Sequence, residues 1–249
     1  SNVVFFATPS GGGSGQIFQW KVNGVNAGTK DNTFTTNTLV DGDVVTCVLT
    51  SSLPCVTAPT ATSNSLNMTV NPVQVTAVNI AATPGNTICS GTSVAFTATP
   101  TNPGTTPAYQ WKVNGSNVGT NSNTYTSSTL ANGNNVTCVL TSNATCATPA
   151  SVTSNTVSMT VNPVLTPAVT IAANPGTTVC AGTSVTFTAT PTHPGTAPSY
   201  QWKVNGFNVG TNSNTFVTST LANTDAVTCL LTSNALCAAS TTANSNTLN

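Results

Sequence analysis

The chain has 249 residues, a length that fits one large domain or two to three small ones. It carries four lysines, four aspartates and one histidine, lacks arginine and glutamate, and has a formal net charge of zero. Such a chain has no basic surface that would attract nucleic acid or anionic lipid. Apolar residues make up 38% of the sequence, but they are dispersed and form no run long enough to insert into a membrane.

The sequence is internally repeated. The hexapeptide QWKVNG begins at Gln19, Gln110 and Gln201, and cysteines, prolines and Asn-Pro dipeptides recur at the same interval of 91 residues. A unit of this length can bury a core of its own, whereas the shorter units of solenoids cannot. The first and last units begin and end inside the repeat, so we expect them to be truncated. The predicted modules are repeat one at 1–71, repeat two at 72–162 and repeat three at 163–249.

The composition predicts an all-β fold with almost no helix, because strand-favouring Thr, Val and aromatic residues are abundant and good helix formers are scarce. Strand 93–98 is the clearest, since Val94, Phe96 and Ala98 alternate with small polar residues. A strand is also expected around Val136, Cys138 and Leu140. In repeat two, in chain order, the remaining strands are expected at 75–82, 109–113, 124–130 and 152–161.

The tryptophans and lysines of the QWKVNG motif lie on opposite faces of the third strand. Tyr109, Trp111 and Val113 share one face and Lys112 takes the other. We therefore predict core aromatics rather than sugar-stacking platforms at Trp20, Trp111 and Trp202. An isopeptide bond would need a buried lysine beside a carboxyl group, and no carboxylate recurs in all repeats, so the recurring lysines are expected to be solvated.

The order of these elements resembles the immunoglobulin fold. Trp111 stands where strand C of that fold has its buried tryptophan, and the run that ends at Cys138 matches the passage from strand E to the strand F cysteine. Strand B has Phe96 and Ala98 where its cysteine would be, so the usual disulfide between strands B and F is not expected. The resemblance implies tandem immunoglobulin-like β-sandwich modules.

Four sequence segments indicate a more specific family resemblance. CSGTSVAFTATP, YQWKVNG, VTCVLTSN and MTVNPV are similar to the immunoglobulin-like repeats of very large Bacteroidota-type surface and gliding-associated adhesins. This resemblance covers the whole chain. It implies an extracellular or cell-surface location, export by the type IX system and a role in attachment, and it supplies no catalytic or ligand-binding residue.

Eight cysteines in a chain this apolar indicate an oxidising compartment. No CxxC motif occurs and His193 is not repeated, so no metal site is expected. Three cysteines are expected in the core, and they remain free thiols in the first of the pairings given below: Cys47, Cys138 and Cys229. The candidates for disulfide bonds are Cys55, Cys89, Cys146, Cys180 and Cys237.

Three pairings of these cysteines remain open. In the immunoglobulin arrangement, Cys89 lies in the turn between strands A and B, at the end where the chain leaves for the next module, and Cys237 lies in the facing loop between strands F and G. The first pairing is therefore a staple between modules, Cys89 with Cys237, in which the repeat-one counterpart of Cys89 bonds Cys146. The second is a hairpin bridge between Cys138 and Cys146. The third joins Cys89 to Cys138.

Other candidate sites have simpler interpretations. The segment 41–43, Asp-Gly-Asp, could contribute calcium ligands, but its counterparts at 132–134 and 223–225 lack that carboxylate pair, so a β-turn is expected. His193 is expected in an exposed loop. The glycines 11–13 are not followed by the lysine and helix of a phosphate-binding loop. No acid–base constellation can be assembled, so we expect neither enzymatic activity nor a cofactor.

Three functions fit these features. The first is a stalk or fibre segment of an extracellular adhesin, which presents a distal binding region, with each module adding roughly 35 to 45 Å. The second is a module that binds a glycan or protein through the B–C and F–G loops, and the third is an accessory domain of a secreted hydrolase. The expected partners are neighbouring modules, and the low charge also favours lateral association of arrays into filaments.

Overall fold

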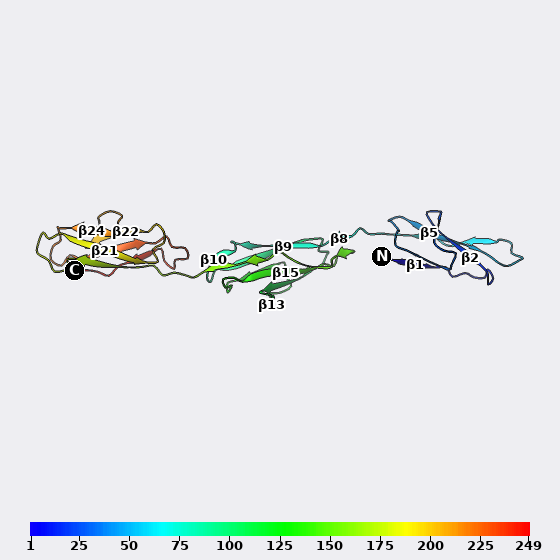
Figure 1. Cartoon of the computed structure of the whole chain (residues 1–249), viewed down its shortest axis with the longest axis horizontal. Coiled ribbons are helices and arrows are strands. Elements are labelled where there is room, and N and C mark those ends of the chain that lie inside the picture. Colours follow the sequence, from blue (N-terminus) through cyan, green and yellow to red (C-terminus); the bar gives the residue numbers. More distant parts are fainter. The chain divides into compact units, whose positions relative to one another are not determined.

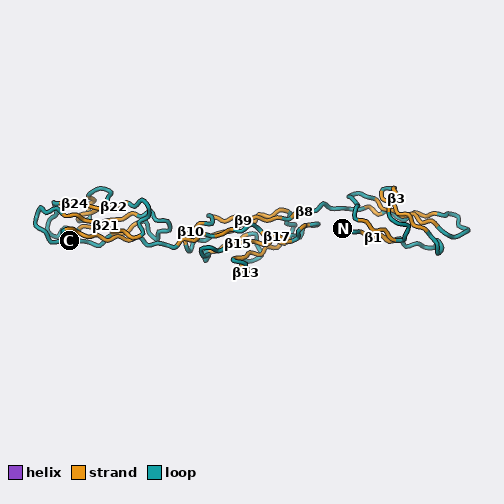
Figure 2. The backbone as a smooth tube through the Cα atoms, in the orientation of Figure 1, coloured by secondary structure: helices purple, strands orange, loops and turns teal.

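The structure is a computed structural model that describes all residues, Ser1–Asn249. It consists of strands, turns and loops without a helix, as Figures 1 and 2 show. The all-β prediction is confirmed. No helix with the length and hydrophobicity of a membrane span is found.

Repeat one forms two sheets. Its strands are β1 (Val3–Phe6), β2 (Ile17–Val22), β3 (Val25–Ala27), β4 (Thr33–Thr36), β5 (Val44–Thr50), β6 (Thr60–Thr62) and β7 (Leu66–Asn67). The first sheet pairs β1 with β4. The second sheet has the order β3-β2-β5-β6, and β7 also pairs with β5.

Repeat two has the same two sheets with additional strands. The strands are β8 (Gln74–Val75), β9 (Ala77–Thr83), β10 (Thr87–Cys89), β11 (Val94–Thr101), β12 (Ala108–Val113), β13 (Ser116–Val118), β14 (Thr124–Ser127), β15 (Asn135–Thr141), β16 (Ala147–Thr148), β17 (Ser151–Thr153), β18 (Val157–Ser158) and β19 (Thr160–Asn162). The first sheet has the order β14-β11-β9, and the second has the order β13-β12-β15-β17 with β18 on β15. Two short parallel pairs, β10 with β19 and β16 with β8, complete it.

Repeat three contains β20 (Ala168–Asn174), β21 (Val185–Thr192), β22 (Ser199–Val204), β23 (Phe207–Val209), β24 (Thr215–Thr218), β25 (Val227–Thr232) and β26 (Thr242–Asn244). One sheet has the order β20-β21-β24 and the other β23-β22-β25-β26. Strands β21, β22 and β24 can be followed in Figure 1.

The strand order is that of an immunoglobulin-like sandwich. Strands β9, β11 and β14 occupy positions A, B and E of one sheet, and β12, β15 and β17 occupy positions C, F and G of the other. The two sheets meet through Phe96 and Trp111, whose ring centroids are 6.2 Å apart. The prediction of tandem immunoglobulin-like sandwiches is confirmed.

Each repeat has a hydrophobic cluster of its own, made of side chains that alternate inward along the strands. In repeat two, Phe96, Trp111 and the three inward residues of β15 are fully buried. Those three are the predicted Val136, Cys138 and Leu140. The period-two pattern in the sequence therefore identifies the core correctly.

The chain divides into two compact units, one of Ser1–Val75 with Ala144–Thr148 and one of Thr76–Asn143 with Pro149–Asn249. Residues 144–148 belong to the first unit because β16 pairs with β8. The units do not follow the three predicted repeats, so the module boundaries at 71 and 162 stay a prediction.

The strand expected at 152–161 is wrong in its continuity, because β17, β18 and β19 replace it. The ladder breaks at Ser154, whose Oγ accepts a hydrogen bond from the Cys138 amide at 2.9 Å. The Asn155 side chain bonds the amide and carbonyl of Ile80 at 2.7 and 3.1 Å. The Ser154 amide still donates to the Cys138 carbonyl at 2.9 Å, so side chains replace only part of the backbone pairing here. Strand β19 then pairs with a new partner, β10.

Two further expectations need correction. The strand expected at 124–130 ends at Ser127, although Leu130 beyond it is buried in the core. The turn expected around Cys89 contains the short strand β10, which forms because β19 lies parallel to it. Both differences depend on partners distant in sequence.

Candidate functional site

The most distinctive feature of the chain is the linker that follows β19. Strand β10 lies parallel to β19 with Cys89 opposite Asn162, and the Ser90 amide donates to the Asn162 carbonyl at 2.9 Å. Pro163 comes next, and its ring restricts the backbone φ angle. The Cys89 side chain is therefore placed at the start of the linker.

The loop that carries Cys237 is held against the other end of the linker. The Leu165 amide donates to the Cys237 carbonyl at 2.9 Å, and the Ala239 amide donates to the Leu165 carbonyl at 2.7 Å. Cys237 has a φ of 62°, a left-handed conformation that is uncommon for residues other than glycine. This tight turn brings its side chain alongside the linker.

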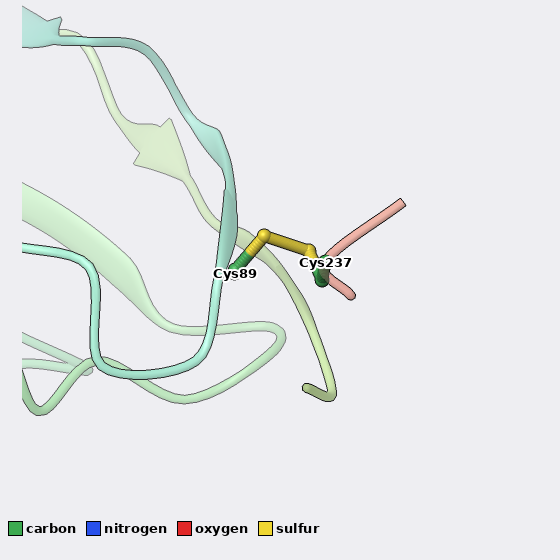
Figure 3. Close-up of a disulfide and its surroundings, with 2 residues drawn as sticks. All are labelled: Cys89 and Cys237. Carbon is green, nitrogen blue, oxygen red and sulfur yellow. A yellow bond between two sulfur atoms is a disulfide. The ribbon is translucent and has the colours of Figure 1, made fainter. Parts of the chain in front are cut away.

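The structure joins these two cysteines in a disulfide, shown in Figure 3. Their Cα atoms are 5.4 Å apart, within the usual range for a disulfide, and the residues are separated by 148 positions in sequence. One end of the bond lies beside Asn162 and the other beside Leu165. Repeats two and three are thus connected twice at this point, once by the linker itself and once by the disulfide.

The bonded pair is the one named in the staple hypothesis, and the two alternative pairings are absent. Cys138 and Cys146 are both free thiols, one buried and one exposed, so no hairpin bridge joins them. Cys89 is bonded to Cys237 and cannot also bond Cys138.

The same loop-to-linker pattern occurs 91 residues earlier. The Gln74 amide donates to the Cys146 carbonyl at 3.0 Å, and Cys146 has a φ of 61°. The repeat-one counterpart of Cys89 is not part of this sequence, so its bond to Cys146 stays a prediction. The other candidates, Cys55 and Cys180, are likewise exposed free thiols.

The remaining cysteines are core residues. Cys47, Cys138 and Cys229 are buried and free. Burial raises the pKa of the Cys138 and Cys229 thiols to about 11, although a backbone hydrogen bond opposes part of this effect. Reactive cysteines are thiolates with lowered pKa, so these two are packing residues in the neutral form.

A pH dependence of stability follows from these two thiols. Between pH 9 and about 11 the unfolded chain loses their protons while the folded chain retains them, so the free energy of unfolding falls as the pH rises through this window. Urea titrations at pH 8 and pH 10.5 measure the fall. The Cys138→Ala/Cys229→Ala variant should show a smaller fall, and an equal fall in this variant would contradict the assignment.

The tryptophans are core residues in all three repeats. Trp20, Trp111 and Trp202 are at most 3% exposed. Each Nε1 donates to a loop carbonyl, which for Trp111 is that of Ser122 at 2.9 Å. The Trp111 ring packs against those of Phe96 and Tyr125, with centroid distances of 6.2 and 5.9 Å, and these two rings also stack on each other. No face of these rings is available for a sugar.

The acidic positions belong to turns. Asp43 is buried and accepts hydrogen bonds from the Asn23 side chain at 2.7 Å and the Val40 amide at 2.8 Å. Asp225 accepts the matching pair, and the amide of Ala222 and the side chain of Asn205 lower its pKa. No group of three or more His, Cys, Asp or Glu residues suitable for a metal ion occurs in the structure.

The lone histidine and the motif lysines are surface residues. His193 lies exposed in a loop, where its Nδ1 is 3.2 Å from the Thr166 carbonyl oxygen. Its φ of 49° matches the 48° of its counterpart Asn102, so the turn accepts either side chain. Lys112 is half-buried on the face of β12 opposite Trp111.

Sequence reasoning missed the role of Asn155, which connects the two sheets of its sandwich through Ile80. Asn246 forms the same pair of bonds with Ile171 at 2.7 and 3.1 Å. The available signal was the Ser-Asn dipeptide that recurs every 91 residues, at 63–64, 154–155 and 245–246.

Comparisons with known proteins found similarity to solved structures only, at low TM-scores. No protein-family model matches the sequence, and no curated protein is significantly similar to it. Among solved structures, the three N-terminal domains of the Hoc capsid protein of bacteriophage RB49 have a TM-score of 0.39 and 11% identity, with 99% of this chain and 94% of that chain covered.

Two further structures have comparable similarity. The eight N-terminal immunoglobulin domains of Down Syndrome Cell Adhesion Molecule give a TM-score of 0.43 at 13% identity, with 100% of this chain and 42% of that chain covered. The ectodomain of mouse nectin-like molecule 4 gives 0.37 at 13% identity, with 98% and 91% covered. At these values the immunoglobulin-like assignment rests on the strand order within this chain.

Proposed function

We propose that this chain is a structural segment of an extracellular array, whose repeats act as spacers held in fixed orientation at their junctions. The observation that carries the proposal is the disulfide between Cys89 and Cys237, which runs beside the linker between Asn162 and Leu165. A module that only had to fold would need no covalent bond to its neighbour. Disulfides persist mainly in oxidising compartments, which supports an extracellular location.

Two features support a repeated junction. The hydrogen bond from Gln74 to Cys146 has the same form as that from Leu165 to Cys237. The positive φ angles of the two loop cysteines agree within 1°. The loop cysteine and its backbone geometry recur with the 91-residue period. We therefore expect the same kind of junction between successive repeats.

The parent protein, in this proposal, is a surface adhesin of the Bacteroidota type that is exported by the type IX system and attached to the cell. Support for this finer assignment comes from the four sequence phrases that resemble such repeats. The repeats would then hold a distal binding region away from the surface. The nearly uncharged surface, with four lysines and four aspartates in the chain, favours lateral contact between such arrays.

Binding through the F–G loop of repeat three is disfavoured as an alternative. Cys237 in this loop is bonded to Cys89, and the loop backbone is paired with Leu165. Both the side chain and the backbone of the loop are therefore used at the junction rather than presented to a ligand.

Single-molecule Förster transfer tests the spacer role. Dyes are attached through non-canonical amino acids at Ser116 and Phe207, which are exposed in β13 and β23. The oxidised chain should give one narrow distribution of transfer efficiency, because two connections restrict the junction. Reduction, or the Cys89→Ser/Cys237→Ser substitution, should broaden it. Equal widths in the oxidised and reduced chains would show that the disulfide does not set the orientation.

A further inference from the structure

The disulfide between Cys89 and Cys237 offers tension a second covalent route through repeats two and three. Along the backbone alone, tension would pass through every strand from β9 to β26. The bond leaves repeat two at the end of β10 and enters repeat three after β25. Residues 90–236, which contain β11 to β25, therefore lie off the shorter route.

The part of this route in repeat two is already extended. Strands β9 and β10 follow one another along the length of the repeat in Figure 1. Only the three residues 84–86 separate them, and β9 is paired with β11 over all seven of its residues. A strand already spans about 3.3 Å per residue, so tension finds little slack to draw out of this segment.

The part of the route in repeat three also runs the length of its sandwich. Beyond Cys237 the chain returns antiparallel to β25. Strand β26 pairs with the second half of β25, and Leu248 forms a bridge with Val227 at the start of β25. The segment 238–248 thus connects the junction loop with the opposite end of the sandwich. One strand-like segment in each repeat lies on the route.

The disulfide also changes how tension loads the junction. Strands β10 and β19 are parallel, with Cys89 opposite Asn162. The end of β10 is connected to repeat three by the disulfide, and the end of β19 is connected to it by the linker. Tension from repeat three therefore pulls both strands in the same direction. Without the bond it would act on β19 alone and shear a ladder of three residue pairs.

Two asparagines fasten the route to the rest of each sandwich. In repeat two, Asn155 lies off the route and bonds the amide and carbonyl of Ile80 in β9 at 2.7 and 3.1 Å. In repeat three, Asn246 lies on the route and bonds Ile171 of β20, off the route, at the same two distances. Each loaded segment is thus held by a side-chain bridge in addition to its backbone ladder.

We propose that the disulfide directs tension along one end strand of each sandwich and keeps both cores out of the line of force. This inference rests on the spacer role proposed above, because a spacer between a surface and a bound target is loaded at both ends. The bypassed residues include most of the buried clusters of repeats two and three. The cysteines are 148 positions apart, so at about 3.4 Å per residue the intact bond withholds about 500 Å of chain from stretching.

Single-molecule stretching of the full 249-residue chain tests the bypass. The chain is held through peptide tags at its termini, so that no thiol is used for attachment. Without reductant, the fully stretched length should be about 500 Å shorter than that of the Cys89→Ser/Cys237→Ser variant. Reductant should restore this length to the parent chain, and the control Cys146→Ser/Cys180→Ser should match the unreduced parent. Equal stretched lengths of the parent and the Cys89→Ser/Cys237→Ser chain would overturn the proposal.

Variants of the two bridges test the route within each sandwich. In the oxidised chain held at constant force, Asn155→Ala should speed the detachment of β9 about tenfold, because two hydrogen bonds are lost. Asn246→Ala should do the same for the segment 238–248. Phe207→Ala, an exposed residue in the bypassed β23, should change neither rate. Unchanged detachment in both asparagine variants would contradict this route.

The tension route and the spacer role fail separately. The Förster measurement is made without load and reports orientation alone. A narrow distribution there, combined with unchanged detachment in the asparagine variants, would overturn the tension route and leave the spacer role. Equal Förster widths for the oxidised and reduced chains, combined with the shortened stretched length, would overturn the fixed orientation and leave the bypass.

Discussion

Replacement of both Cys89 and Cys237 by serine is expected to lower the free energy of unfolding of repeats two and three by about 4 to 5 kcal/mol, as chain entropy predicts for a bond that closes a long loop. The two residues are 148 positions apart, so the disulfide constrains much of the unfolded chain. When only one of the two repeats is unfolded, the disulfide still closes a loop in the unfolded segment. It therefore lowers the conformational entropy of the unfolded chain for either repeat. Serine is chosen at both positions so that no new thiol remains.

Urea denaturation under non-reducing conditions measures this loss, with amide exchange in β15 and β25 reporting the two repeats separately. The matched control is Cys146→Ser/Cys180→Ser, which removes two exposed thiols that form no disulfide. That control should unfold at the same urea concentration as the parent chain. A loss of similar size in both variants would show that serine substitution, and not the bond, is responsible.

Substitution of Trp111 by alanine is expected to destabilise repeat two by about 4 kcal/mol, within the range for removal of a large buried aromatic side chain. Trp111 is fully buried between the sheets, where it contacts the Phe96 and Tyr125 rings. The substitution also removes the hydrogen bond to Ser122 and leaves that carbonyl without the indole donor. Both losses act on the centre of the sandwich.

Amide exchange in β12 and β15 should detect this loss in repeat two, while β22 and β25 in repeat three provide an internal reference. The matched control is Phe207→Ala, an aromatic residue that is 77% exposed in β23. Surface substitutions of this kind usually change stability by less than about 0.5 kcal/mol. A small effect of Trp111→Ala would mean that the sheets close over the cavity without cost.

Strand identity could be predicted well because the half-buried faces follow a period of two. Val94, Phe96 and the inward residues of β15 could be placed in the core by alternation alone. The limits of strands were less predictable. Strand β14 ends at Ser127, and the last strand breaks at Ser154, because hydrogen bonds with distant residues decide where a ladder stops.

The candidate site was predictable only in part. The repeat and the immunoglobulin-like order indicate which loops face each other across a linker, and this supports Cys89 with Cys237 among three pairings. Choosing among them requires the direction of each side chain, and this depends on the parallel pairing of β10 with β19 and on the left-handed turn at Cys237. Neither feature has a local sequence signal.

By itself the sequence determined the all-β class, the 91-residue repeat, the inward tryptophans and the near absence of charge, because composition and short-range periodicity carry that information. Only the tertiary structure decided the cysteine pairing and the Asn155 bridge between sheets. Each of these depends on contacts between segments far apart in sequence. Their geometry exists only when both sheets are folded.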